Sequence, residues 1–326
     1  MTTCKNRNWH SDFLEIFSII GVLAHGIFSC ENHALAQITP DGTLGNNSSI
    51  ITGNVNIKGS AADRIDGGAI RGTNLFHSFQ EFNVGELQRV YFANPTGISN
   101  IFTRVTGSNI SNILGTLGVN GNANLFLINP NGIIFGNNAR LDVAGSFVGT
   151  TANSFVFGNG LEFSATNPQT PSALLTVNPS ALFFNQIVAA PIQNNSVAPA
   201  GIDPAGFNAF GLRVGDGKSL LLVGGNVIMD GGQLNAYGGR VELGGLAAPA
   251  NVNLLFNGDN LSLKFPLNVT RADVSLTNQA SVYVEAAGSG DIAINARNID
   301  ILAGSAFCWY RLWFGPTRGN CGGYHA

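Results

Sequence analysis

Cysteine is missing from most of this chain of 326 residues. The four cysteines are Cys4, Cys30, Cys308 and Cys321. The long stretch between residues 31 and 307 can therefore form neither a disulfide nor a thiolate metal site. An exported chain of this kind can stay unfolded in an oxidising compartment without being trapped by cross-links.

Charge is scarce as well. Only 11% of the residues are charged and the formal net charge is −3. Nucleic-acid binding needs clustered Lys and Arg, so this composition argues against a nucleic-acid partner. The low charge and the 44% of hydrophobic residues also argue against a disordered chain.

Familiar catalytic motifs are absent: there is no H-E-x-x-H, no G-x-S-x-G and no phosphate loop. His77 has no nucleophile or metal set near it in the sequence, so we interpret it as a structural polar residue. Asp63 and Asp66 form the closest carboxylate pair, but their Gly- and Ala-rich surroundings favour solvated turn residues. We expect no catalytic residue, no metal site and no cofactor.

The N-terminus resembles a signal peptide. Two basic residues precede the apolar run Ile16–Phe28, and Ala34 and Ala36 fit the A-x-A pattern. We expect residues 1–36 to be removed by cleavage before Gln37. The alternatives are a membrane anchor, for which the run falls short of roughly 20 residues, and a lipoprotein acylated at Cys30, which lacks small residues before it. No later stretch is long and apolar enough to span a membrane.

Glycine is abundant, with 42 residues, and it accompanies Asn, Val, Ile and Leu, which is typical of an all-β protein with many tight turns. Strand-sized segments occur at 50–59, 90–93, 98–105, 110–119, 125–128, 133–135, 139–143 and 146–148. In the segment 139–143 the alternation predicts that Ala139, Leu141 and Val143 point inward.

An internal repeat appears further on. Gly-Gly pairs at 224–225, 231–232 and 238–239 are seven residues apart, and Leu220, Val227, Leu234 and Val241 follow the same spacing. A coiled coil is excluded because each Gly would cost a helix about 0.8–1 kcal/mol relative to Ala. Short strands joined by Gly-Gly corners fit better, and three such units of about 21 residues would close one triangular coil of a parallel β-helix. The pattern returns over 274–301.

A β-helix needs a cap over its first open sheet edge. The N-terminal segment with Phe76, Phe79 and Phe82 is our candidate, as an apolar plug at one end, although the spacing of three also allows a short helical turn. In the coils, Asn side chains at corners are expected to form ladders with Asn of the neighbouring coil.

Two Asn-Pro turns interrupt the strands. Asn129, Pro130, Asn131 and Gly132 have the chemistry of a type I turn before Ile133, with the Asn129 side chain accepting from the backbone two residues on. A second copy is expected at Asn94, Pro95, Thr96 and Gly97. Both turns are either plain corners or part of a functional signal.

The last segment, 303–326, does not continue the strand pattern. It differs from the coils in composition, because it is rich in Trp and Cys and contains no acidic residue. We interpret it as a frameshift or truncation scar, with an aromatic cap as the competing interpretation.

Three segments together carry a family resemblance: Arg71–Phe79, Val90–Pro95 and Asn124–Gly136. They resemble the N-terminal secretion domain of filamentous haemagglutinin-like exoproteins, the TpsA partners of two-partner secretion (TPS). Cyanobacterial members often open with Gln-Ile-Thr-Pro-Asp, as this chain does from Gln37. At the first turn the family often has Asn-Pro-Asn-Leu, whereas this chain has Asn-Pro-Thr-Gly.

The resemblance implies a right-handed parallel β-helix with an N-terminal cap and small extra-helical β elements. It assigns 37–160 to the secretion domain and 161–302 to further coils. It also implies recognition in the periplasm by the POTRA domains of a TpsB/Omp85-type outer-membrane transporter, within the region Asn94–Ile133. The expected product is a monomeric adhesin on the surface of a Gram-negative-type bacterium, with host or cell-surface glycans as further partners. A polysaccharide-active β-helix enzyme and a purely structural fibre are the alternatives.

Overall fold

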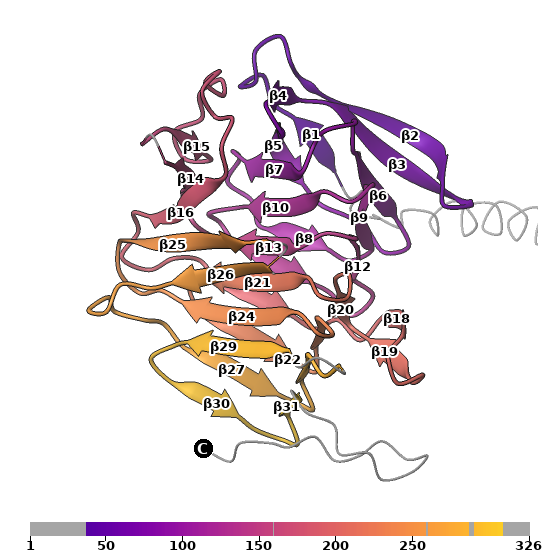
Figure 1. The fold of residues 1–326 in the computed structure, drawn as a ribbon, viewed down its shortest axis with the longest axis vertical. Coiled ribbons are helices and arrows are strands. Elements are labelled where there is room, and N and C mark those ends of the chain that lie inside the picture. Colours follow the sequence, from indigo (N-terminus) through magenta and orange to yellow (C-terminus); the bar gives the residue numbers. More distant parts are fainter. Residues whose placement is uncertain (1–36, 159, 259, 287–289, 309–326) are drawn as a thin grey trace, which may run out of the picture. The chain divides into compact units, whose positions relative to one another are not determined.

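Every regular element among the described residues is a β-strand, and most strands stack in parallel ladders (Figure 1). The computed structural model describes residues 37–308, except 159, 259 and 287–289. The expected signal peptide and most of the segment 303–326 therefore lie outside the described residues.

The first face of the helix is a parallel ladder that runs the length of the described coils. Its strands are β5 (Asn74–Phe82), β7 (Asn100–Val105), β10 (Asn124–Ile128), β13 (Phe147–Thr150), β21 (Ser219–Gly224), β24 (Arg240–Gly245) and β29 (Asp291–Asn295). We name each coil after its strand on this face.

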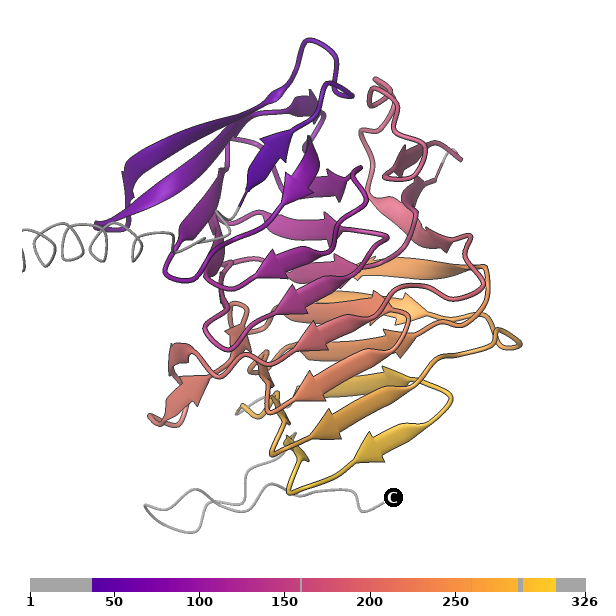
Figure 2. The same cartoon turned by 180° about the vertical axis from the view of Figure 1, so that it is seen from behind.

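Two further faces complete each coil (Figure 2). The second contains β8 (Ser111–Ile113), β11 (Ile133–Phe135), β17 (Ile192–Asn194), β22 (Val227–Asp230), β27 (Val274–Thr277) and β30 (Ile299–Ile301). The third contains β3 (Ser60–Gly67), β6 (Arg89–Ala93), β9 (Thr116–Asn120) and β12 (Arg140–Asp142), then β20 (Leu212–Arg213), β23 (Gln233–Asn235), β28 (Ser281–Tyr283) and β31 (Ala306–Cys308). Only one bridge, between Val143 and Val214, joins the two parts of the third face among the described residues.

The seven-residue period is confirmed by the strand register. β21, β22 and β23 form one coil, and β24 then returns to pair with β21, so that Leu220 lies beside Val241. The fold is a right-handed parallel β-helix, as the resemblance implied. Its interior is a single hydrophobic cluster that extends from Ile65 to Val284.

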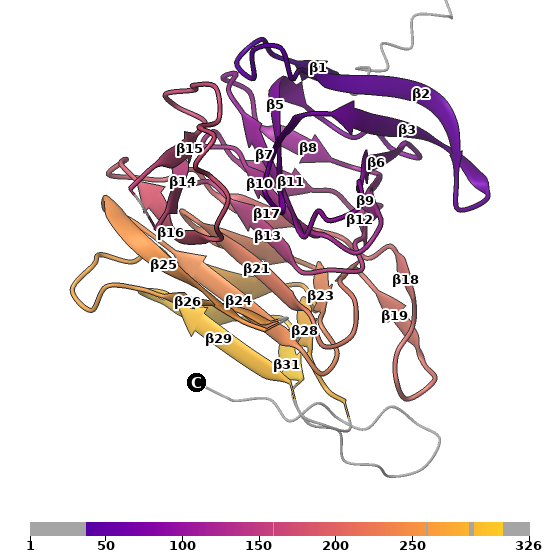
Figure 3. The same cartoon turned by 45° about the horizontal axis from the view of Figure 1, so that its top comes forward.

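The first face is buried on both sides. A separate antiparallel sheet covers its outer surface and consists of β14 (Ser154–Phe157), β15 (Glu162–Ser164), β16 (Pro179–Phe184), β25 (Ala250–Asn257) and β26 (Asn260–Lys264) (Figure 3). The rings of Phe76, Phe102 and Phe126 stack in this second core, with centroids 5.3 and 4.6 Å apart. Strands buried on both faces explain the continuous apolar run at 125–128.

The cap is made by four strands that precede the first coil. β1 (Ile38–Pro40) and β4 (Ala69–Arg71) pair antiparallel with β5, and β2 (Ser49–Ile57) forms a hairpin with β3. The alternative of a short helical turn was wrong, because the segment with the three phenylalanines pairs with β7 in extended conformation. Phe79 and Phe82 fill the coil interior, whereas Phe76 belongs to the second core.

Two local expectations were wrong. The segment 110–119 is two strands, β8 and β9, because a corner at Gly115 separates them; a Cβ there would stand 2.3 Å from the Gln88 carbonyl oxygen. Asp63 and Asp66 lie in β3 rather than in a loop. Asp63 accepts a hydrogen bond from Gln88, and Asp66 pairs with Arg64 at 2.7 Å.

Two elements were not foreseen in detail. A hairpin of β18 (Pro199–Ile202) and β19 (Asn208–Phe210) projects between β17 and β20. β31 lies inside the segment that we set apart as a tail, and it pairs in parallel with β28. The interpretation of the tail as a frameshift scar stays a prediction.

Candidate recognition site at the asparagine corners

The Asn129 corner has the expected turn geometry. The Gly132 backbone N–H donates to the Asn129 carbonyl at 3.1 Å, and the Asn131 N–H donates to the Asn129 side-chain oxygen at 3.0 Å. Gly132 adopts φ of +124°, a conformation that favours glycine. Ile133 then enters β11, between Ser111 and Ile192 of the neighbouring coils.

The same corner is tied to the preceding coil. The buried Asn129 amide nitrogen donates to the Asn109 carbonyl at 3.0 Å and to the Ser111 hydroxyl at 2.9 Å. The Asn131 amide donates to the Gly107 carbonyl at 2.8 Å. Sequence reasoning missed these bonds, because a turn motif specifies local geometry and gives no sign of what lies one coil away.

Burial limits what this corner can contact. Asn129, Pro130, Gly132 and Ile133 are buried, and only Asn131 is partly exposed. In the folded chain the motif therefore offers almost no surface to a partner. Its direct effect is to fix the path of the β10 coil against the β7 coil.

The Asn94 corner differs from its expected copy. The turn bond runs from the Ile98 N–H to the Pro95 carbonyl at 3.1 Å, one residue later than predicted. Gly97 has φ of +85° at the third position of this turn, where a type II turn requires a positive φ. The Asn94 side chain is turned toward the next coil and accepts from the N–H groups of Asn122 and Ala123 at 2.9 and 3.0 Å. The expectation of a second identical turn was wrong, although Pro95 and Gly97 are exposed.

An asparagine ladder connects the starts of the first-face strands, as predicted. The Asn100 amide donates to Asn74 and the Asn124 amide donates to Asn100, both at 3.0 Å. The ladder continues in serine, where the Ser146 N–H donates to the Asn124 side chain and the Ser219 N–H donates to the Ser146 hydroxyl. These bonds give each coil a polar partner in the coil before it.

A buried arginine of the β7 coil, Arg104, forms hydrogen bonds with the cap. The Arg104 guanidinium donates to the hydroxyls of Ser78 at 2.8 Å and Thr43 at 2.7 Å, and to two carbonyls of the segment after β14. Burial lowers the pKa of Arg104 to about 10, and the nearby Asp41 charge opposes that shift. Burial alone would raise the pKa of Asp41, but hydrogen bonds from Thr106, Thr43 and Ser78 outweigh it and lower that pKa. No motif in the sequence indicated this network.

His77 is a structural residue, in line with its interpretation from the sequence. It is fully buried, its ring packs on Phe92 with centroids 5.1 Å apart, and Nδ1 lies 2.9 Å from the Ser49 hydroxyl. Burial lowers its pKa to about 3. The imidazole is therefore neutral at physiological pH.

Only one residue of the predicted cleavage site lies among the described residues. Gln37 is the first described residue and is exposed, whereas Ala34 and Ala36 lie outside the described residues. Within residues 37–308, apart from the stated gaps, no group of three His, Cys, Asp or Glu side chains is arranged to hold a metal ion. That same part of the chain contains no helix with the length and hydropathy needed to span a membrane.

Comparison with known proteins shows the family. A model of the TPS secretion domain matches residues 36–294. The chain is 29% identical over 143 residues to the heme/hemopexin-binding protein of Haemophilus influenzae strain KW20/Rd, a match that covers 44% of this chain but 15% of that protein. A second heme/hemopexin-binding protein of Haemophilus influenzae is 32% identical over 118 residues, which are 36% of this chain and 12% of the relative.

The fold has a solved counterpart. The secretion domain of HMW1 from Haemophilus influenzae matches with a TM-score of 0.52 and 19% identity, over 85% of this chain and 67% of that chain. At this identity the likeness shows a shared fold alone. The family match covers most of the chain, from the cap to β29. The chain therefore belongs to the TPS secretion domain family, whose members are exoproteins exported by two-partner systems.

Proposed function

We propose that the POTRA domains of a TpsB outer-membrane transporter recognise this chain in the periplasm through the region Asn94–Ile133. Family membership implies a transporter partner, and the structure of the corners supports a role for this region. Because the Asn129 corner is buried against the preceding coil, it acts on recognition by shaping the β10 coil rather than by touching the transporter.

Exposed parts of the same end of the molecule are suited to direct contact. β2 is the last strand of its sheet, and Ile50 on it is 57% exposed. An extended segment of a partner can add to such an edge through main-chain hydrogen bonds. The exposed residues 95–97 of the other corner lie in the proposed region itself.

The architecture is suited to export of an unfolded chain. Each coil contacts mainly its neighbours, so folding can propagate as successive coils emerge. Residues 37–307 contain no cysteine, so no disulfide has to form within this segment first. After export we propose a surface location and an adhesive role for the exoprotein.

A double variant tests the corner. Asn129→Ala with Pro130→Ala should strongly reduce the amount of chain exported through its transporter, measured as surface-exposed or secreted protein in cells that express both partners. The matched control is Asn235→Ala. Asn235, the last residue of β23, also has a buried amide that donates two bonds to the preceding coil, to the Phe210 carbonyl at 2.6 Å and the Leu212 carbonyl at 3.1 Å.

The control separates recognition from stability. Each single Asn→Ala change should lower stability by roughly 1–3 kcal/mol, the cost of orphaned buried polar groups. Export should fall for the double variant Asn129→Ala with Pro130→Ala and stay near normal for Asn235→Ala. Equal losses in both would reduce the motif to a general stability effect, and undiminished export of the double variant would refute the role of the corner.

A further inference from the structure

A pocket of about 400 Å³ lies where the third face of the helix is interrupted. β12 ends the first part of that face, and among the described residues only the Val143–Val214 bridge connects it to β20. The hairpin of β18 and β19 leaves the helix beside this gap (Figure 3). The pocket is therefore a consequence of a coil whose third strand is displaced by an insertion.

Arginine dominates the polar lining of the pocket. Arg89, Arg140 and Arg213 come from β6, β12 and β20 of the third face and meet around one cavity. The chain contains only 16 basic residues in total. Three guanidinium groups at one concave site therefore concentrate positive charge in a chain whose net charge is negative.

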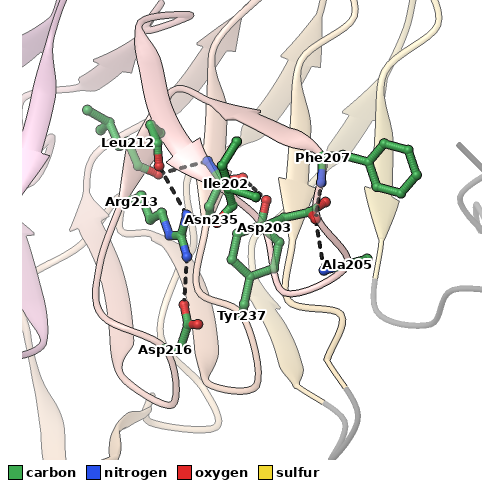
Figure 4. A network of polar contacts seen from close by, with 10 residues as sticks. Ile202, Asp203, Ala205, Phe207, Leu212, Arg213, Asp216, Asn235 and Tyr237 are labelled. Carbon is green, nitrogen blue, oxygen red and sulfur yellow. Dashed lines mark hydrogen bonds and ion pairs between the residues drawn. The ribbon is translucent and has the colours of Figure 1, made fainter.

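Two of these arginines are held in place by the protein. Arg213 donates to the Ala200 carbonyl at 3.1 Å and the Ile202 carbonyl at 2.7 Å, and it pairs with Asp216 at 2.9 Å. Figure 4 shows its guanidinium reaching Asp216 close to the Tyr237 ring, whose centroid lies 4.9 Å from Cζ. These contacts anchor the hairpin and fix the side chain in advance of any ligand.

Arg89 is fixed in a similar way. Its guanidinium donates to the Ile57 carbonyl at 3.2 Å and to the Tyr91 hydroxyl at 2.9 Å, and it lies over the Tyr91 ring. Tyr91 in turn donates to Asp142 at 2.7 Å. Burial, with the hydrogen bond to Asp142, raises the pKa of Tyr91 to about 12, so the phenol remains a donor at neutral pH.

Arg140 is different from both. It is exposed, and its guanidinium has no hydrogen-bond or ion-pair partner in the part of the chain that the structure describes. A guanidinium fork binds a planar carboxylate with two parallel hydrogen bonds. With two arginines preset and one free, the pocket can accept an oxyanion at a low cost in ordering.

The lining also contains acceptors. The Asp142 side chain is 37% exposed; it pairs with Lys58 at 2.6 Å and accepts from Tyr91, and its two oxygens keep further lone pairs. Thr116 contributes a hydroxyl. Because β12 is the last strand of its sheet, its outer main-chain groups face the gap rather than another strand. A ligand suited to this pocket therefore carries hydroxyl donors as well as a negative charge. A sugar acid has both, whereas an inorganic anion lacks the row of hydroxyl groups.

We propose that this pocket binds one carboxylate-bearing sugar unit, such as a uronic acid of an acidic glycan. Arg140 closes on the carboxylate, Arg89 and Arg213 supply the fixed positive field, and Asp142 with Thr116 receives the sugar hydroxyls. The site is on the folded domain and does not depend on recognition by the transporter.

Ligand-observed NMR titration of the full-length chain tests this assignment. The probes are galacturonate, galactose, which differs at C6 by a neutral hydroxymethyl group, and inorganic phosphate. We expect galacturonate to bind with a Kd on the order of 1 mM or tighter, with phosphate weaker and galactose without measurable binding. Binding should also weaken as salt is raised, because the guanidinium charges are partly exposed.

Two variants complete the experiment. Arg140→Ala should weaken galacturonate binding by about tenfold or more, the loss typical of a charge-assisted hydrogen-bonded contact. Arg271→Ala removes the same charge away from the pocket, at a side chain that also has no polar partner among the described residues, and should leave the affinity unchanged. The proposal is overturned by equal binding of galactose, by phosphate binding as tightly as galacturonate, by equal losses in both variants, or by no galacturonate binding at 10-fold the expected Kd, about 10 mM.

Discussion

The coils from β5 to β10 and the coils from β21 to β24 both have close glycine contacts at their corners, but only the first group adds a ladder of asparagine side chains. In the first group asparagine side chains bridge from coil to coil, as in the ladder of Asn74, Asn100 and Asn124. Close backbone contact occurs in both groups: a Cβ on Gly107 would stand 2.0 Å from the Gln80 carbonyl oxygen in the first, and one on Gly239 would stand 2.0 Å from that of Lys218 in the second.

The two groups also differ in the number of residues per coil. A side chain spans a gap, so the register advances from residue 74 to 100 and then to 124 without breaking the ladder. Where Gly-Gly pairs recur every seven residues, the register from Ser219 to Arg240 keeps the regular spacing. The coil with Gly-Gly pairs at 224–225, 231–232 and 238–239 therefore displays a clear period in the sequence.

The largest effect is expected from filling a glycine contact. Gly239→Ala should lower the free energy of unfolding by about 3 kcal/mol, because the new methyl group meets the main-chain carbonyl of Lys218, which cannot move aside as a side chain could. Urea unfolding followed by circular dichroism measures the change.

Its matched control is Gly217→Ala. Gly217 has φ of +75° but a Cβ there would meet nothing within 4 Å, so only backbone strain of about 1–2 kcal/mol is expected. If both variants lose the same stability, close approach is not what glycine provides in these coils.

A smaller loss is expected from breaking the asparagine ladder. Asn100→Ala removes the donor for the side-chain oxygens of Asn74 and Asn178 and the acceptor for the Asn124 amide. We expect about 2 kcal/mol from these orphaned groups. The exposed Asn138→Ala should stay within about 0.5 kcal/mol in the same urea series, and an equally small effect of Asn100→Ala would contradict the ladder's role.

The smallest effect is expected on the pH dependence of stability, through the buried His77 of β5. The pKa of His77 is lowered to about 3 by burial, against about 6.5 in an unfolded chain. As the pH falls below 6.5 the unfolded chain binds a proton that the folded chain does not, so stability decreases, by about 1 kcal/mol between pH 6.5 and 5.5. His77→Gln should remove this part of the slope in urea unfolding at the two pH values. An unchanged slope would show that the imidazole titrates in the folded state as it does when unfolded.

Period and alternation were enough to predict the parts of the fold that repeat. The spacing of Leu220, Val227, Leu234 and Val241 gave the triangular coil, and Ala139, Leu141 and Val143 point inward as expected. The pairing of β16 with β25 was beyond such reasoning. These strands are antiparallel, lie far apart in the sequence and follow no period, and only their packing on the first face selects them.

The corners show the same limit at the level of single residues. The turn bond at Asn129 follows from local chemistry, which sequence reasoning captures. The shifted turn at Pro95 does not, because the Asn94 side chain is occupied by Asn122 and Ala123 of the next coil. The pocket arginines likewise stand at residues 89, 140 and 213, which only the stacking of coils brings together.

The phenylalanine stack on the outer surface of the first face has a consequence for the order of folding. Phe76, Phe102 and Phe126 belong to early coils, but their cover comes from Phe155, Phe157 and Phe163 and, last, from Phe256 on β25. Contacts of such long sequence separation form slowly. A chain that emerges N-terminus first thus carries an incompletely covered aromatic stripe until β25 arrives, and during that interval the exposed apolar surface makes it prone to self-association.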